Sequence, residues 1–214
     1  MISISVKELS KKFNKNLLFQ NLNFTINQEE HLVILGHNGS GKSSLLKCMM
    51  FYNYPSSGEV VLTVNQKIIS LEEIAKSIAV ATPYLSLEED LTFQEIIEFQ
   101  QRFKPLKEGY TPKSIIALAG LEKHSKKRLK SFSSGMKQRV KLSLAIFFDT
   151  PFLFLDEPCS NLDAQSVAWY QEMLSNNLQN RIAVVCSNQN KEEFFFARKS
   201  IKLGQKQPQI VDVN

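Results

Sequence analysis

Eight consecutive residues near the start of the chain, GHNGSGKS, match the pattern G-x-x-x-x-G-K-[ST] of a phosphate-binding loop. Glycines let successive backbone N–H groups converge on phosphate oxygens, and a following helix adds positive potential at its amino end. Lys42 would reach the β- and γ-phosphates, and the Ser43 hydroxyl would ligate Mg²⁺. An apolar run before the loop and a helical pattern after it argue against a chance glycine turn. We therefore expect a nucleoside triphosphate site formed by Gly36, His37, Asn38, Gly39, Ser40, Gly41, Lys42, Ser43 and Ser44.

Two acidic residues end a second apolar run, PFLFLDEP, at residues 151–158. A buried parallel strand here would deliver Asp156 to the carboxyl edge of the sheet, beside the phosphate loop, where it can hold the Mg²⁺ shell. Glu157 follows directly and could polarise an attacking water as a general base. The alternative is a surface acidic pair after a core strand, and the presence of the phosphate loop argues against it.

The elements that must position these groups alternate between strands and helices. Alternating and β-branched runs predict strands, and apolar residues at i, i+3 and i+4 predict helices. Such an order is typical of an α/β core with a mainly parallel sheet and flanking helices. Strands are expected at 2–9, 18–26, 31–35, 77–81, 151–156 and 181–187, a hairpin at 58–69, helices at 44–52, 91–103, 111–121, 134–148, 163–179 and 191–198, and one or two edge strands at 200–213.

Composition and charge exclude several classes of protein. The chain is 43% hydrophobic and 22% charged, which is ordinary for a globular protein. It has no apolar run long enough to span a bilayer and no signal-peptide pattern at its start, so we expect a cytoplasmic protein. The three cysteines lack metal-ligand spacing and are expected to be reduced and structural. The basic run at 123–130 is expected to be a solvated face, with nucleic acid or anionic lipid binding as the alternative.

A third stretch, FSSGMKQR at residues 132–139, opens a predicted helix with small polar residues. A helix cap is one interpretation, and a second anion-binding helix end is the other. The acidic pair after it is followed by SNLD, residues 160–163. In this order, the three stretches resemble those of an ABC-type ATPase, the nucleotide-binding subunit of ATP-binding cassette transporters. The resemblance covers nearly the whole chain.

The resemblance implies one domain over residues 1–214, with a P-loop core, an antiparallel β lobe at roughly 1–30 and 58–70, and a helical lobe inserted at about 84–130. It implies ATP and Mg²⁺ as cofactors, bound in a head-to-tail homodimer or heterodimer that sandwiches two ATP molecules. Ser133 and Gly135 of one chain would cap the γ-phosphate held by the other, and Asp163 would lie across the dimer interface. Phe13 matches the aromatic residue that stacks on adenine, with core packing as the alternative.

The resemblance also implies partners and a location. Membrane-spanning subunits on separate polypeptides would dock beside the loop TPYLSLEED, residues 82–90. The chain would then be peripheral at the inner face of the cell membrane, and no nucleic acid partner is expected. The alternatives are an ATP-gated binding module that acts on something other than a transporter, and a hydrolysis-deficient regulatory partner of an active homologue.

Two positions depart from the family pattern. The family places a glutamine that senses Mg²⁺ and water where this chain has Pro83, and proline has neither a side-chain donor nor a backbone N–H. After the last core strand, the family usually has a histidine that contacts the γ-phosphate and steadies the catalytic glutamate. Here Asn188 stands at that position, and it can still donate a neutral hydrogen bond. We therefore expect Glu157 and Asn188 as catalytic residues, with Mg·ATP bound well and hydrolysed slowly, or efficiently only with partners.

Overall fold

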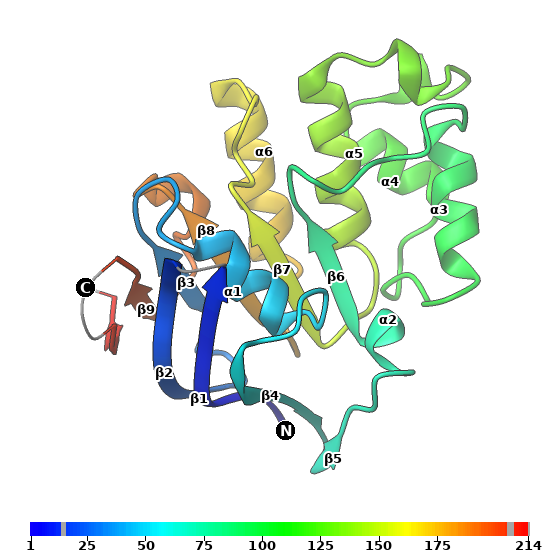
Figure 1. The fold of residues 1–214 in the computed structure, drawn as a ribbon. Helices are drawn as coiled ribbons and strands as arrows, with labels where there is room; N and C mark the ends of the chain where they lie inside the picture. The colour runs from blue at the N-terminus through cyan, green and yellow to red at the C-terminus, as the bar shows by residue number, and fades with distance from the viewer. Residues whose placement is uncertain (14–15, 205–207, 214) are drawn as a thin grey trace.

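The computed structural model describes residues 1–13, 16–204 and 208–213, which form two β-sheets and the helices that cover them (Figure 1). A four-stranded sheet has the order β2-β1-β4-β5, and a six-stranded sheet has the order β10-β9-β3-β8-β7-β6. Figure 1 shows the four-stranded sheet at one end of the molecule and the helices α3, α4 and α5 at the other. Within the described residues, no helix is both long and apolar enough to cross a membrane.

The four-stranded sheet is antiparallel throughout, as predicted for the β lobe. Ile4 lies opposite Ile26 on one neighbouring strand and Leu62 on the other, and all three side chains are fully buried. The predicted hairpin turn is formed by Asn65 and Gln66, which both have positive φ angles, of 50° and 67°. The strands are β1 (Ile2–Phe13), β2 (Asn16–Asn27), β4 (Ser57–Val64) and β5 (Lys67–Ile68).

The six-stranded sheet is parallel except for its last strand, which runs antiparallel to β9. Every residue of β7 and β8 is buried, which explains their uninterrupted apolar sequence. Because β3, β8 and β7 are neighbours and run in parallel, their carboxyl ends meet at one edge of the sheet. The strands are β3 (Leu32–Leu35), β6 (Ile78–Ala81), β7 (Phe152–Asp156), β8 (Ile182–Ser187), β9 (Lys199–Lys202) and β10 (Ile210–Asp212).

Four of the helices, α3 to α6, begin at residues whose side chains cap them. Thr92 and Glu95 form a capping box, in which the Glu95 carboxylate accepts from the Thr92 backbone N–H at 2.7 Å. Thr111 and Ser114 make the equivalent arrangement one helix later, where Pro112 occupies the first turn. The helices are α1 (Lys42–Met49), α2 (Ile74–Ser77), α3 (Phe93–Gln101), α4 (Pro112–Leu118), α5 (Ser134–Ile146) and α6 (Ala164–Ser175), with 3₁₀ turns at Glu122–His124, Leu129–Ser131 and Lys191–Glu193.

Two predictions for the end of the chain were wrong in part. The helix expected at 191–198 is only the 3₁₀ turn Lys191–Glu193, because the aromatic residues after it pack in different directions. The ring of Phe195 meets Tyr170 edge-on, and that of Phe196 meets His31. In the tail, β10 is an edge strand as predicted, but β9 lies inside the sheet between β10 and β3.

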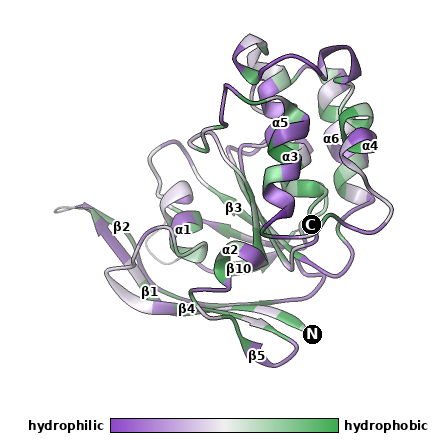
Figure 2. Cartoon of the chain, turned by 90° about the vertical axis from the view of Figure 1, so that its right-hand side faces the viewer, coloured by the Kyte–Doolittle hydropathy of each residue, from purple (hydrophilic) through white to green (hydrophobic). Residues whose placement is uncertain are grey.

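The apolar core has two parts, one on each face of the parallel sheet. Alternate residues of β7 contribute to each part: Leu153 and Leu155 pack with the helices α3 to α6, and Phe152 and Phe154 pack toward α1 and the antiparallel sheet. Figure 2 shows the apolar residues concentrated on the strands in the middle of the molecule. The segment that contains α3 and α4 coincides with the predicted helical lobe, while the assignment of the chain to one domain stays a prediction.

Candidate active site

The phosphate-loop residues follow β3, and Lys42, Ser43 and Ser44 form the first turn of α1, at the edge of the sheet where β7 and β8 also end. Gly41 precedes α1 with a φ angle of 101°, and a Cβ atom there would come within 3.3 Å of Leu18. Gly36 is restricted more severely, because an added Cβ atom would lie 2.3 Å from Ser40 Oγ. Since no side chain caps α1, the N–H groups of its first turn are available to an anion.

Lys42 is folded back over the loop, with only 5% of its surface exposed. Its Nζ atom donates to the carbonyl of Gly36 at 2.8 Å and to that of His37 at 3.3 Å. It also donates to Oδ1 of Asn188. These contacts hold the ammonium group of Lys42 near the amino end of α1. Phosphate oxygens would compete there with the carbonyl and amide oxygens for its hydrogen bonds.

Asp156 ends β7 and is 3% exposed. Burial raises the pKa of its carboxyl group, and a hydrogen bond with the Ser43 side chain acts in the opposite direction. A buried carboxylate beside a hydroxyl is suited to a hard cation, because a cation would compensate the cost of burying its charge. The described residues contain no cluster of three or more His, Cys, Asp or Glu side chains with metal-ligand geometry.

Glu157 leaves the strand direction of β7 because its φ angle is 47°, in the left-handed region that few non-glycine residues adopt. Its backbone N–H donates to the Cys186 carbonyl on β8 at 3.0 Å. Its carboxylate accepts from Nδ2 of Asn188 at 2.6 Å. The left-handed conformation therefore directs Glu157 toward the phosphate loop, and the backbone hydrogen bond connects it to the neighbouring strand β8.

Asn188 joins the elements that meet at this edge of the sheet. Its Nδ2 group donates to Glu157 and, at 2.9 Å, to Oδ1 of Asn38 in the phosphate loop, while its Oδ1 atom accepts from Lys42. Both N–H groups and the oxygen of the Asn188 amide therefore have hydrogen-bond partners. Pro83 takes no such part: its carbonyl accepts from Lys141 on α5 at 3.3 Å.

A pocket of about 510 Å³ opens beside these groups, within the range of small-molecule sites. Phe13 lines one end and is 69% exposed, so it is not part of the core. Asn16 and Leu18 were not predicted as site residues, because they reach the pocket only through the pairing of β2 with β1 beside Phe13. The lining residues are Phe13, Asn16, Leu18, Asn38, Gly39, Gly41, Lys42, Ser43, Ser44 and Glu157. Gly36, His37 and Ser40 shape the loop behind it, and Ser40 Oγ is buried without a hydrogen-bond partner among the described residues.

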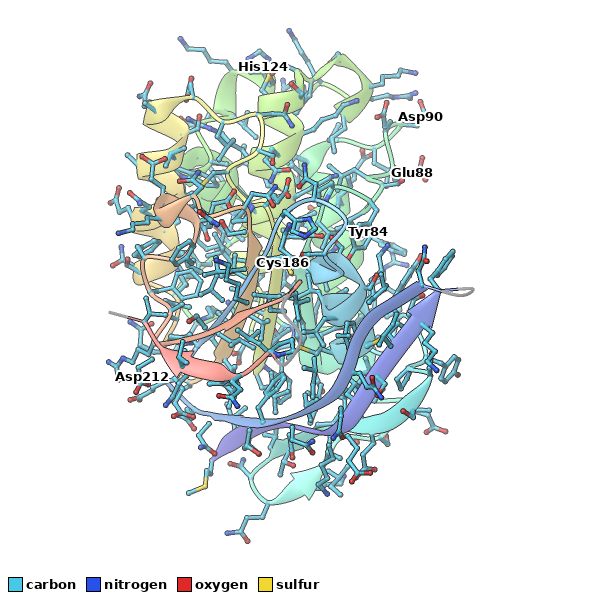
Figure 3. The ribbon with its side chains drawn as sticks, turned by 60° about the vertical axis from the view of Figure 1, so that its left-hand side comes forward. Tyr84, Glu88, Asp90, His124, Cys186 and Asp212 are labelled. Atoms are coloured by element: carbon cyan, nitrogen blue, oxygen red, sulfur yellow. The ribbon has the colours of Figure 1, made fainter. Side chains whose placement is uncertain are left out.

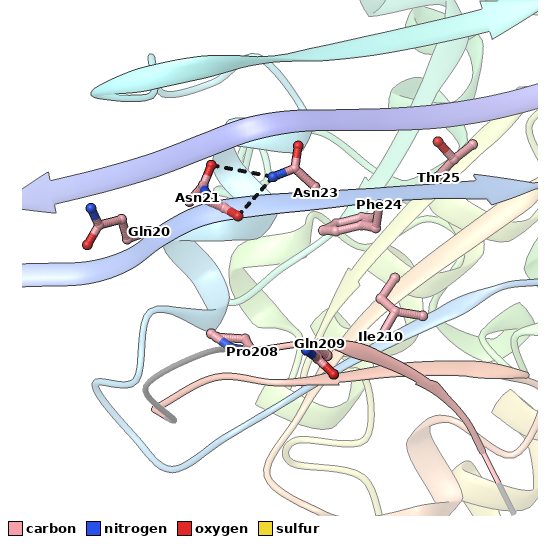
Figure 4. Close-up of a pocket in the computed structure, with 8 residues that line it drawn as sticks. All are labelled: Gln20, Asn21, Asn23, Phe24, Thr25, Pro208, Gln209 and Ile210. Atoms are coloured by element: carbon pink, nitrogen blue, oxygen red, sulfur yellow. Dashed lines mark hydrogen bonds between the residues drawn. The ribbon is translucent and has the colours of Figure 1, made fainter.

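A larger pocket of about 760 Å³ lies between β2 and the start of β10 (Figure 4). Its described lining is uncharged and rich in amides, and the Asn23 side chain there donates to the Asn21 carbonyl at 3.0 Å. It offers no cation to a phosphate group, so it is a weaker candidate for the nucleotide.

The residues lining the phosphate-loop pocket do not include Ser133, Gly135 or Asp163, which lie elsewhere in this chain. Ser133 caps α5 by accepting from the Met136 backbone N–H at 3.3 Å, and Gly135 allows α5 to approach the loop after β7, since a Cβ atom there would lie 3.1 Å from the Asn161 carbonyl. Asp163 caps α6, and its hydrogen bonds with Ser166 lower the pKa of its carboxyl group. Both caps are exposed.

Other predicted features were also located. Cys48, Cys159 and Cys186 are buried free thiols, as expected of structural cysteines. The basic run at 123–130 is partly neutralised, because Asp90 accepts from Lys130 at 2.8 Å and lies 3.7 Å from Arg128.

Residues 19–160, which carry the phosphate loop, the helical segment and the acidic strand, match the family model of the ABC transporter. The chain is 31% identical over 186 residues to the spermidine/putrescine import ATP-binding protein PotA of Thermotoga maritima, a match that covers 85% of this chain and 50% of PotA. It is 27% identical over 192 residues to the uncharacterized ABC transporter ATP-binding protein YybJ of Bacillus subtilis, covering 89% and 87%. The chain therefore spans half the length of PotA and most of YybJ.

The fold is similar to that of solved cassettes. The dimeric structure of a post-hydrolysis state of the ATP-binding cassette MJ0796 bound to ADP and Pi superposes with a TM-score of 0.81 at 19% identity, over 99% of each chain. Because the family model matches most of the sequence, and because the strands place its motifs at one edge of the sheet, the chain belongs to the ABC transporter family.

Proposed function

We propose that this chain is the ATP-binding and ATP-hydrolysing subunit of an ABC transporter, whose membrane-spanning subunits are separate polypeptides. The observation that carries the proposal is the chain of hydrogen bonds from Lys42 through Asn188 to Glu157, beside the phosphate-loop pocket. This places a phosphate-binding cation and a general-base candidate at one site.

In the proposed complex, the adenine stacks on Phe13 and the phosphates lie against the loop and the amino end of α1. Lys42 exchanges its bonds to the Gly36 and His37 carbonyls for phosphate oxygens. Ser43 and Asp156 hold Mg²⁺, and their fit rests on the buried carboxylate and its hydrogen bond with Ser43. Bound there, Mg²⁺ would neutralise charge on the β- and γ-phosphates.

The hydrolytic step needs a water molecule held in line with the γ-phosphate. The Glu157 carboxylate accepts a proton from that water or polarises it. Asn188 orients Glu157 through the 2.6 Å hydrogen bond, but its amide is uncharged. We therefore expect hydrolysis to be slower than in a site where a charged donor orients the glutamate. This supports the expectation of slow hydrolysis in the chain without its partners.

The site is completed by a second chain, which is either a copy of this one or a homologue. Ser133 and Gly135 at the exposed amino end of α5 cap the γ-phosphate bound by the other chain, and Asp163 lies near it. Ser133 and Asp163 are exposed and Gly135 is partly exposed, and all three lie outside their own chain's pocket, which supports the head-to-tail arrangement. The MJ0796 cassette is described as dimeric, which supports a dimer here.

The membrane subunits dock at the groove beside the loop 82–90. An apolar pocket of about 390 Å³ supports this, since Met50, Ile78, Tyr52 and Tyr84 are among its lining residues. We accordingly place the chain in the cytoplasm, peripheral at the inner face of the membrane, and as one domain over 1–214 with the helical lobe inserted at about 84–130. No nucleic acid partner is part of this proposal.

Substitution of the general base tests the proposal. Glu157→Gln should bind Mg·ATP but not turn it over, so an ATP-bound dimer should accumulate in size-exclusion chromatography with light scattering. Lys42→Ala in the same background is the control, because it should abolish ATP binding and leave a monomer. A monomeric Glu157→Gln chain at saturating ATP would contradict the sandwich.

Phosphate release tests hydrolysis separately. The wild-type chain should release phosphate from Mg·ATP faster than Glu157→Gln does. Equal rates with ATP binding intact would overturn the hydrolytic role and favour the hydrolysis-deficient alternative.

A further inference from the structure

The loop that follows β6 is attached to α5 by lysines of that helix. Nζ of Lys141 donates to the Thr82 carbonyl at 3.2 Å and to the Pro83 carbonyl at 3.3 Å. Lys141 lies about two helical turns after Ser133, the residue that caps the same helix. The main chain of the loop therefore contacts α5 at Pro83, the position where this chain lacks the side-chain donor of the family's glutamine.

The attachment continues along the loop. Glu89 accepts from Lys137 at 2.6 Å, and Lys137 is four residues before Lys141 on the same face of α5. The backbone N–H of Lys130, just ahead of α5, donates to the Glu89 carbonyl at 2.9 Å. Figure 3 shows Tyr84, Glu88 and Asp90 in succession along this loop, which climbs from beside α1 to the far end of the helical lobe.

Part of the space between the loop and the helix is open. A pocket of about 340 Å³ lies there, and Pro83, Lys137, Lys141, Ser134 and Asn161 are among the residues that line it. Polar contacts of Lys137 and Lys141 connect the loop to the helix beside this pocket, in addition to the packing of Leu87 and Leu91 against the apolar core. Burial and the nearby Lys137 lower the pKa of Lys141, which agrees with a lysine drawn into the structure.

We propose that Lys141 is a positioning residue that makes the loop 82–90 and the amino half of α5 move as one unit. A displacement of the loop by a docked partner then reaches Ser133 and Gly135, and through them the nucleotide bound by the other chain. Because Pro83 has no side-chain donor, Lys141 of α5 contacts the loop through the carbonyl groups of Thr82 and Pro83. This inference rests on the proposed function, because Ser133 acts on ATP only in the dimer.

The test uses the Glu157→Gln chain and measures the ATP concentration that gives half-maximal dimer. Lys141→Met should raise that concentration about 10-fold, the scale of a lost hydrogen bond from a charged donor. It should leave the affinity of the monomer for ATP unchanged, because Lys141 does not line the phosphate-loop pocket. Lys141→Arg keeps the donors and should recover most of the loss.

The matched control is Lys104→Met. Like Lys141, Lys104 is a partly buried lysine that donates to a backbone carbonyl. Its partner is Ile78 at the start of β6, at 2.8 Å, and Lys104 does not lie on α5. It should change the half-maximal ATP concentration less than about 2-fold, within the scale of an uncoupled site. Equal shifts for Lys104→Met and Lys141→Met would overturn the inference, since both would then report general stability.

A double-mutant cycle with Ser133→Ala separates positioning from stability. If Lys141 acts through the amino end of α5, Lys141→Met should have a smaller effect once Ser133 is alanine. Strictly additive effects would overturn the inference while leaving the dimer intact. If the Glu157→Gln parent stays monomeric, the proposed function is wrong and this inference falls with it.

Discussion

The side-chain amide of Asn188 donates to the carboxylate of Glu157 across 2.6 Å while its oxygen accepts from Lys42. Asn188 follows β8, Glu157 follows β7, and Lys42 lies in the phosphate loop after β3, as the first residue of α1. The three groups meet because these strands are neighbours in one parallel sheet. An amide is neutral over the physiological pH range, so it links the carboxylate of Glu157 to Lys42 without adding charge.

Replacing Asn188 tests this link. Asn188→Ala should lower kcat for phosphate release about 10²-fold, because Glu157 loses a preorganised donor. Asn188→His should raise kcat above the wild-type value, since a histidine reaches further and can carry charge. The measurement is phosphate release at saturating Mg·ATP, with Glu157→Gln as the blank. An unchanged kcat in Asn188→Ala would show that the hydrogen bond does not contribute to the reaction.

Phe13 is predicted to bind the base of the nucleotide. Phe13→Ala should raise the Kd for ATP about 10-fold or more, the scale of a lost aromatic–base stack. Since Phe13 is 69% exposed, the melting temperature should hardly change. Leu17→Ala is a matched control, because Leu17 is 48% exposed on β2 and is not a lining residue of the pocket. Equal Kd values for the two variants, measured by calorimetry, would argue against stacking.

His31 makes the fold sensitive to acid. Burial, together with Arg198 and Arg181, lowers the pKa of His31 from 6.5 to about 4, and its Nδ1 accepts from the Ala183 backbone N–H at 3.2 Å. The unfolded chain therefore takes up a proton at a higher pH than the folded chain. The stability due to neutral His31 is complete above pH 6.5 and is lost as the pH falls toward 4.

His31→Asn should flatten this part of the pH dependence. Asparagine cannot take up the proton, and it tolerates the φ angle of 40° at this position. Urea midpoints between pH 7 and pH 4.5 measure the slope, with exposed His37 replaced by Asn as the control. The same slope in His31→Asn and wild type would mean that other groups cause the acid sensitivity.

Arg181 is predicted to stabilise the end of α5. It is 1% exposed and donates to the carbonyls of Ile146, Phe148 and Thr150, each at 3.1 Å. Arg181→Met leaves these buried acceptors without donors and should lower the free energy of unfolding by about 3 kcal/mol. Arg198→Met, at an exposed position, should change it by less than about 0.5 kcal/mol. Chemical denaturation measures both, and equal losses would contradict the role assigned to Arg181.

The wrong or missing predictions have tertiary causes. The periodicity of KEEFFFAR predicts a helix, but Phe195 and Phe196 pack against different aromatic partners, so tertiary contacts override the pattern. The position of β9 inside the sheet and the place of Asn16 in the pocket depend on which strands become neighbours. No local pattern encodes that order.

The sequence by itself determined the chemistry of the phosphate loop, because residues 36–43 are contiguous and their backbone geometry follows from glycine spacing and the helix after it. It also determined the placing of Asp156, since an apolar parallel strand must end at the carboxyl edge of its sheet. Only the tertiary structure decided that Asn188 bonds to Lys42, Asn38 and Glu157, that Asp90 neutralises part of the basic run, and that Lys141 meets the carbonyls of Thr82 and Pro83. These contacts join residues far apart along the chain, and their geometry depends on how the sheet and helices pack, which no short stretch of sequence specifies.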